Sequence, residues 1–219
     1  MKIENPILLA LALAFTSLSA HGAVVLNEVM ASTTGADAEF IELYNTGGSP
    51  IDLSGWEIRL YESDAGASLG SLDGTVSITV GIIQPGGYFL IGNDEFVTDY
   101  GINPDLLDSS LSIENSSVTI QLVDSLGGSE DIVYMTDGGA GDMANIAGDT
   151  LITPSISIGP DGSFFPAGFT RDTPGGSTAS ILEFSPSPAP SATPTAAVPE
   201  PSLALLSVLG VLLGYRRQR

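Results

Sequence analysis

Several kinds of side chain are absent or scarce, and each absence excludes a class of chemistry. The 219-residue chain has no cysteine, which excludes disulfides, thiolate catalysis and cysteine-ligated metals. Its one histidine is His21 and its one lysine is Lys2, so the long middle region contains neither residue as a base or a Schiff-base former. The G-x-S-x-G match at residues 66–70 therefore has no histidine to activate its serine. These absences predict a protein that is not an enzyme.

Positive charge is also scarce. The chain has 26 acidic and six basic residues, for a formal net charge of −20, and only Arg59 and Arg171 lie away from its two ends. Such an acidic body repels phosphate, so we expect no nucleic-acid partner. Solubility, cationic partners or divalent cations fit this charge better.

Both ends of the chain have the composition of targeting segments. Residues 1–22 combine Lys2, a short apolar run and small side chains before Ala23, which predicts a cleaved secretory signal peptide. Residues 185–198 are rich in Pro, Ser, Thr and Ala, which predicts an extended linker. Residues 202–215 are apolar, and as a helix they would be about 21 Å long. This is shorter than the roughly 30 Å hydrocarbon core of a bilayer, so the segment would have to thin the bilayer or be completed by the flanking arginines.

The C-terminal end resembles the PEP-CTERM sorting signal of Gram-negative bacteria. The resemblance rests on three parts in order: Val198-Pro199-Glu200-Pro201, the apolar stretch 202–215, and Arg216, Arg217 and Arg219. It implies Sec-dependent export, transient insertion of residues 202–215 in the inner membrane, and processing by an exosortase. It also implies a final location at the outer surface or in the extracellular matrix, with a role linked to exopolysaccharide or biofilm.

The body, residues 23–184, has the pattern of a β protein. Short apolar or alternating segments separated by Gly-, Pro- and Asp-rich turns predict strands at 24–30, 39–44, 51–53, 56–61, 75–80, 88–91, 117–123 and 131–135, with a last one at 155–159. Residues 94–100 are expected to form one helical turn, with Asn93 or Asp94 as its N-cap. We therefore predict an all-β fold, an antiparallel β-sandwich.

The body also resembles the lamin tail domain. The resemblance covers about residues 24–179 and includes Pro85-Gly86, residues 159–162 and residues 173–175. Its central motif residues are Glu28, Glu39, Phe40, Glu42, Leu43, Asn45, Leu53, Gly55 and Trp56. It implies an immunoglobulin-like sandwich with a binding, adhesive or structural role. The chain has no coiled-coil rod, so nothing about filaments follows from the resemblance.

Carboxylates are the remaining candidates for chemistry. Glu28, Glu39 and Glu42 are expected to be exposed on strand faces, because ionised groups are seldom buried without a partner; a shared cation is the alternative. The Gly/Asp-rich segment 137–145 contains Asp137, Asp142 and Asn145 as weak calcium ligands, without the spacing of an EF-hand. No other cofactor is expected. Two alternatives to a non-enzymatic surface protein stay open: a carboxylate- and metal-dependent secreted hydrolase, and a calcium-stabilised carbohydrate-binding module.

Overall fold

The computed structural model describes residues 23–33, 36–66 and 68–182. The predicted signal peptide, the linker and the sorting tail with its helix at 202–215 lie outside these residues. Within them, no helix is long and apolar enough to cross a membrane.

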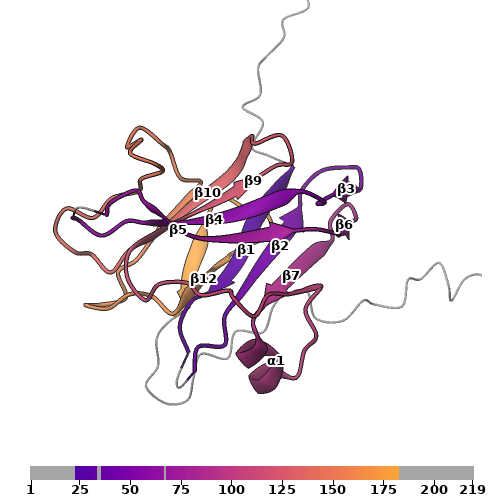
Figure 1. Cartoon of the computed structure of the whole chain (residues 1–219), viewed down its shortest axis with the longest axis horizontal. Helices are drawn as coiled ribbons and strands as arrows, with labels where there is room; N and C mark the ends of the chain where they lie inside the picture. Colours follow the sequence, from indigo (N-terminus) through magenta and orange to yellow (C-terminus); the bar gives the residue numbers. More distant parts are fainter. Residues whose placement is uncertain (1–22, 34–35, 67, 183–219) are drawn as a thin grey trace, which may run out of the picture.

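Two sheets lie one over the other and enclose the main core (Figure 1). The first sheet has the order β13 (Ala179–Leu182), β12 (Gly168–Arg171), β1 (Val24–Met30), β2 (Phe40–Asn45), β7 (Tyr88–Gly92) and β8 (Leu106–Leu107). The second has the order β11 (Ile156–Ile158), β10 (Ser129–Met135), β9 (Val118–Val123), β4 (Trp56–Glu62) and β5 (Leu72–Ile78). A small third sheet pairs β3 (Ile51–Asp52) with β6 (Ile82–Ile83).

Neighbouring strands are antiparallel except at two places. The pairs β7–β8 and β10–β11 are parallel. The architecture is all-β and consistent with an immunoglobulin-like sandwich, as the sequence predicts.

The core follows from the alternation of side chains along the strands. Trp56, Ile58 and Leu60 of β4 point into the main core, as their period of two predicts. The same period places Tyr61 on the opposite, outer face with Glu57 and Arg59, and Tyr61 is not part of the main core. It is nevertheless only 5% exposed, and its hydroxyl lies 3.4 Å from Gln121 Oε1 of the neighbouring strand β9.

A second, smaller apolar cluster lies on the outer face of the first sheet. It contains Phe40 of β2, Leu90 of β7 and Phe96 of α1 (Asp94–Tyr100). The predicted cap of this helix is confirmed: the Asn93 side chain accepts a hydrogen bond from the N–H of Phe96. Helix α1 therefore covers part of the outer face of the first sheet, over Phe40 and Leu90.

The strand predictions need several corrections. The two-residue strands β6 and β8 were not predicted, and β10 begins at Ser129 and not at Asp131. The segment predicted at 75–80 is β5, which begins earlier, at Leu72, and ends at Ile78. The segment predicted as the last strand is β11, but β12 and β13 follow it and complete the first sheet. These two strands are four residues each and carry little periodicity. The pairing of β12 with β1, and of β13 with β12, defines them more than their own composition does.

One ion pair joins the late strands to both sheets. A terminal nitrogen of Arg171, Nη2, lies 2.8 Å from Asp131 Oδ2, and both side chains are 2% exposed. The same aspartate oxygen accepts a hydrogen bond from the N–H of Leu26, and Arg171 Nε donates to the Leu26 carbonyl. Arg171 also donates to the Ser155 hydroxyl and to the Gly176 carbonyl. One side chain thus connects β12, β1, β10 and the loop after β12.

Loss of this cation should be far more costly than loss of the other arginine of the described body. Arg171→Met leaves Asp131 charged and buried, so we expect a loss of about 3–5 kcal/mol in the free energy of unfolding. Arg59→Met is the matched control, because its ion pair with Glu57 is about one-third exposed. Such a pair contributes at most about 1 kcal/mol. Urea unfolding measures both, and equal losses would contradict the structural role of Arg171.

Candidate functional site

Three aspartates converge at one end of the second sheet. Each of Asp64, Asp137 and Asp142 offers a carboxylate oxygen that lies within 4.8 Å of the other two, and all three residues are half-buried. Asp64 follows β4, and Asp137 follows β10. The register of the sheet pairs Glu62 with Val118 and Val118 with Met135, so the three strand ends meet here.

The hydroxyl of Ser117, just before β9, lies at the centre of this cluster. Its Oγ is 2.8 Å from Asp142 Oδ2 and 3.3 Å from Asp137 Oδ1. Asp64 Oδ1 accepts the N–H of Ser117, and Asp142 Oδ1 accepts the N–H of Ala65. Several hydrogen bonds therefore fix the orientation of the three carboxylates.

The electrostatics of the cluster favour negative charge on Asp142. Burial opposes its ionisation, but hydrogen bonds from the Ala65 N–H, the Ser117 hydroxyl and Asp137 outweigh it and lower the pKa of Asp142. The two basic side chains of residues 23–182, Arg59 and Arg171, are paired with Glu57 and Asp131. Among the described residues, no basic side chain is left to neutralise the cluster, and oxygen ligands of this kind suit a hard cation such as calcium.

The predicted calcium ligands are only partly brought together. Asp137 and Asp142 lie in the cluster, but Asn145 does not. The Asn145 side chain accepts the N–H of Gly148, and its backbone N–H donates to Thr119, so it holds its own loop. Sequence reasoning missed Asp64. The sequence places Asp64 just after a predicted strand. It does not show which strands lie beside that one, so it could not bring Asp64 together with Asp137 and Asp142.

The expectation of exposed strand glutamates is wrong for Glu28, Glu39 and Glu42, which are 3%, 3% and 0% exposed. Glu28 and Glu42 face each other across β1 and β2, on the outer face of the first sheet. Asn27 Nδ2 donates to Glu42 Oε1 at 2.7 Å. The polar atoms that surround these glutamates come from neighbouring strands and loops, which local sequence does not show.

Other motif residues organise turns and core. Asn45 ends β2, and its Nδ2 donates to the carbonyls of Ser49 and Ile83 while its Oδ1 accepts the N–H of Gly47. Gly55 has a φ of 82°, which favours glycine in the turn that leads into Trp56. Phe40, Leu43, Leu53 and Trp56 are buried.

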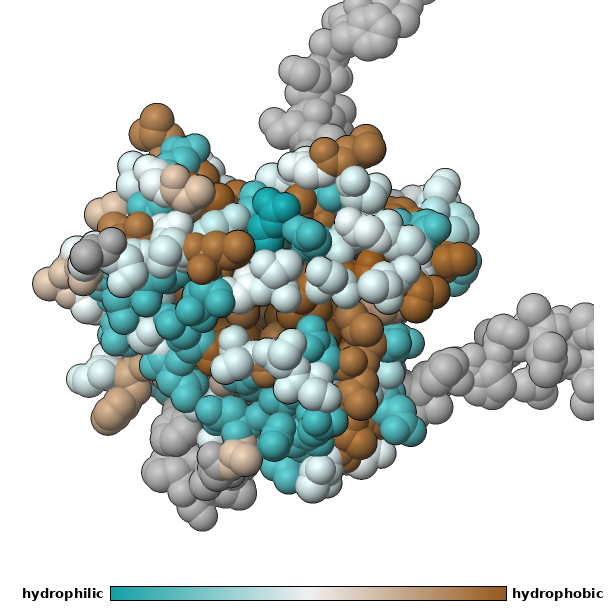
Figure 2. Space-filling view, viewed as in Figure 1, coloured by the Kyte–Doolittle hydropathy of each residue, from teal (hydrophilic) through white to brown (hydrophobic). Residues whose placement is uncertain are grey.

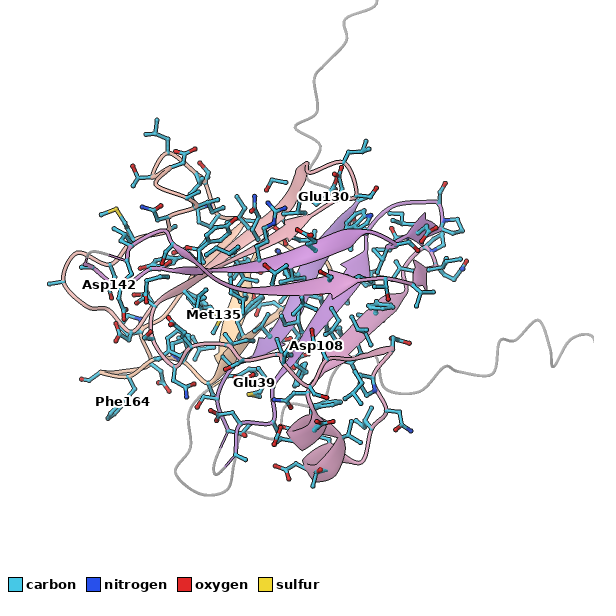
Figure 3. All side chains as sticks on the ribbon, viewed as in Figure 1. Glu39, Asp108, Glu130, Met135, Asp142 and Phe164 are labelled. Carbon is cyan, nitrogen blue, oxygen red and sulfur yellow. The ribbon has the colours of Figure 1, made fainter. Side chains whose placement is uncertain are left out.

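Glu39 directly precedes β2 and is linked to the segment before β9 by a hydrogen bond with Ile113. Its Oε1 accepts the N–H of Ile113 at 2.9 Å, while its Oε2 is buried and has no hydrogen-bond partner among the described residues. Burial raises the pKa of Glu39 to about 8; the Ile113 N–H partly opposes this, and the charges of Asp37 and Glu95 add to it. Figure 3 places Glu39 and Asp142 in different parts of the molecule.

The raised pKa of Glu39 predicts a pH-dependent stability. The folded carboxyl holds its proton up to about pH 8 and the unfolded one only to about 4.5. The contribution is therefore complete below pH 4.5 and is lost as the pH rises to about 8. Glu39→Gln should remove this loss, on the order of a few kcal/mol at pH 8. Urea unfolding from pH 4.5 to 8.5 tests it, with Asp149→Asn in an exposed loop as the control; identical pH profiles for Glu39→Gln and wild type would disprove it.

Comparison with known families supports the resemblance in the body. The family model of the lamin tail domain matches residues 17–137, more than half of the chain. The match ends just after β10 and is shorter than the range 24–179 expected from the motifs. No curated protein is similar enough to count as a relative. This family is a β-sandwich domain of a generally non-catalytic type. With its motif residues built into strands, turns and core, the chain belongs to the lamin tail domain family.

Proposed function

We propose that the chain is an exported, non-enzymatic surface or extracellular-matrix protein of a Gram-negative bacterium, in which the lamin tail domain has a binding, adhesive or structural role. The observation that carries this proposal is the order of three segments in the sequence: Pro199-Glu200-Pro201, the apolar stretch 202–215 and the terminal arginines. Membership of a generally non-catalytic family supports the second half of the proposal.

The proposed partners follow from this route. The Sec machinery exports the chain through its first 22 residues, and residues 202–215 insert in the inner membrane. The arginines stay on the cytoplasmic side, by the positive-inside rule. An exosortase then acts near Glu200, and the domain, whether released, attached or retained at the membrane, works among extracellular polysaccharide or other matrix proteins. The acidic body agrees with a soluble, monodisperse exported domain.

The sorting step predicts a specific change in mass. Protein recovered from cells and medium should lack residues 1–22 and the arginine-rich end, because both are removed during export and sorting. Glu200→Ala should keep the C-terminal end, since it alters the motif but not the apolar stretch. Glu183→Ala is the matched control outside the motif. Intact mass spectrometry measures all three, and a wild-type protein that retains residues 202–219 would refute the sorting proposal.

A calcium-stabilised module is the second candidate, and the convergence of Asp64, Asp137 and Asp142 favours it. Among the described residues these three carboxylates have no basic neighbour, and a bound cation would offset their mutual repulsion. A carboxylate- and metal-dependent hydrolase would use the same cluster. Substitution of Asp137 therefore tests both the calcium-stabilised module and the hydrolase.

The calcium candidate predicts a ligand-dependent melting temperature. Calcium at 100 times its Kd would stabilise the fold by about 2.7 kcal/mol, and EDTA would reverse the rise in Tm. Asp137→Asn should abolish the calcium effect, and Asp149→Asn in an exposed loop should keep it. An unchanged Tm rules the candidate out. Glycoside or phosphodiester turnover that requires Asp137 would instead overturn the non-enzymatic assignment.

A further inference from the structure

A polar groove lies between the start of α1 and the segment that leads to β9. It has a volume of about 410 Å³ and is lined by side chains that include Asp37, Glu39, Asn93, Glu95, Ile113 and Glu114. This volume is within the range of roughly 300–1,000 Å³ that is common for small-molecule sites. Figure 2 shows that the surface around α1 is largely hydrophilic. The groove is separate from the aspartate cluster.

One atom of the groove is unsatisfied. Glu39 is 3% exposed and lines the groove, and its Oε2 has no hydrogen-bond partner among the described residues. An unpaired buried polar group costs about 1–3 kcal/mol, more if it is charged. A ligand that donates a hydrogen bond to Oε2 would remove this cost.

The neighbours of this atom select the sign of the ligand. Asp37, Glu95 and Glu114 are acidic, and none of the residues that line the groove is basic. Asp37 is held in place, because Oδ1 accepts the N–H of Thr33 and Oδ2 accepts from Asn115. The raised pKa of Glu39, caused by burial and by the charges of Asp37 and Glu95, agrees with a carboxyl that lacks a cation. This lining is therefore complementary to a positively charged ligand.

The spacing of the carboxylates separates a metal ion from an organic cation. A calcium ion holds its oxygen ligands at about 2.3–2.6 Å, so those oxygens must lie close together. Among the described residues, only Asp64, Asp137 and Asp142 bring three acidic oxygens within 4.8 Å of one another, and the acidic side chains of the groove do not. Separated acceptors fit a planar cation with several donors, and guanidinium has five N–H groups in a fixed fork.

We propose that this groove binds the guanidinium group of an arginine side chain from a partner protein, with Glu39 Oε2 as the buried acceptor. Asp37 and Glu95 supply the surrounding negative charge. The proposal goes beyond the proposed function and does not depend on export or sorting, because it concerns only the folded domain.

The test titrates the full chain with Nα-acetyl-arginine amide, measured by calorimetry at low salt. We expect one molecule to bind per chain, and the citrulline analogue, which has the same shape without the charge, not to bind. Glu39→Gln should weaken binding by at least about tenfold, because a neutral amide replaces the carboxylate whose charge the guanidinium group pairs with. Glu130→Gln is the matched control, since Figure 3 places Glu130 far from Glu39.

A second variant keeps the test decisive if Glu39→Gln does not fold. Glu95 is exposed in the first turn of α1, so Glu95→Gln should fold and still weaken binding. Equal affinity for wild type, Glu39→Gln and Glu95→Gln would overturn the proposal. Equal binding of the citrulline analogue would also overturn it. Calcium binding in the groove that Glu39→Gln abolishes would overturn the proposal as well, because it would show that the groove is a metal site.

Discussion

The buried pair of Arg171 and Asp131 is the constraint on which the closure of the sandwich depends. Arg171 lies on β12, a four-residue strand, and Asp131 lies on β10 in the opposite sheet. Their shared contact with Leu26 fixes β1 between them. A chain with only two basic residues in its described body uses one of them here, where neither charge reaches solvent. The pair specifies where the late strands dock, which hydrophobic burial alone, being non-directional, does not.

Acidic residues have several different environments in this fold, and Asp131 in its ion pair and Glu39 beside the groove are two of them. Most of the others lie at least partly on the surface. Glu28 and Glu42 are buried on the first sheet. The side-chain amide of Asn27 links Glu42 to a loop, because its Nδ2 donates to Glu42 Oε1 and its Oδ1 accepts the N–H of Gly175. Asp64, Asp137 and Asp142 are clustered at a sheet end. The net charge of the chain therefore says little about any one carboxylate, and only the local partners decide whether it is structural or available to a ligand.

The sequence predicted the elements that have strong local signals. Alternation defined β4 and β9, and the N-cap at Asn93 defined α1. It failed where the partner is distant in the chain. Strand β12 carries little pattern and depends on its pairing with β1, and β13 depends in turn on β12. The contact of Glu39 with Ile113 joins distant parts of the chain, and Asp64 joins its cluster only through the order of β4, β9 and β10. The composition predicts the net charge of the chain. The aspartate cluster and the groove at Glu39 could be located only after the strand order was known.

The position of β13 determines how the domain would carry a mechanical load. Residues 179–182 form the edge strand of the first sheet, and the only ladder on this strand is with β12. Pulling on the chain beyond Leu182 would load these four residue pairs first, and the force would then reach Arg171 at the far end of the ladder. The ion pair thus lies at the last rung of the ladder, the one farthest from Leu182, where it would resist shear after the other three rungs had been loaded.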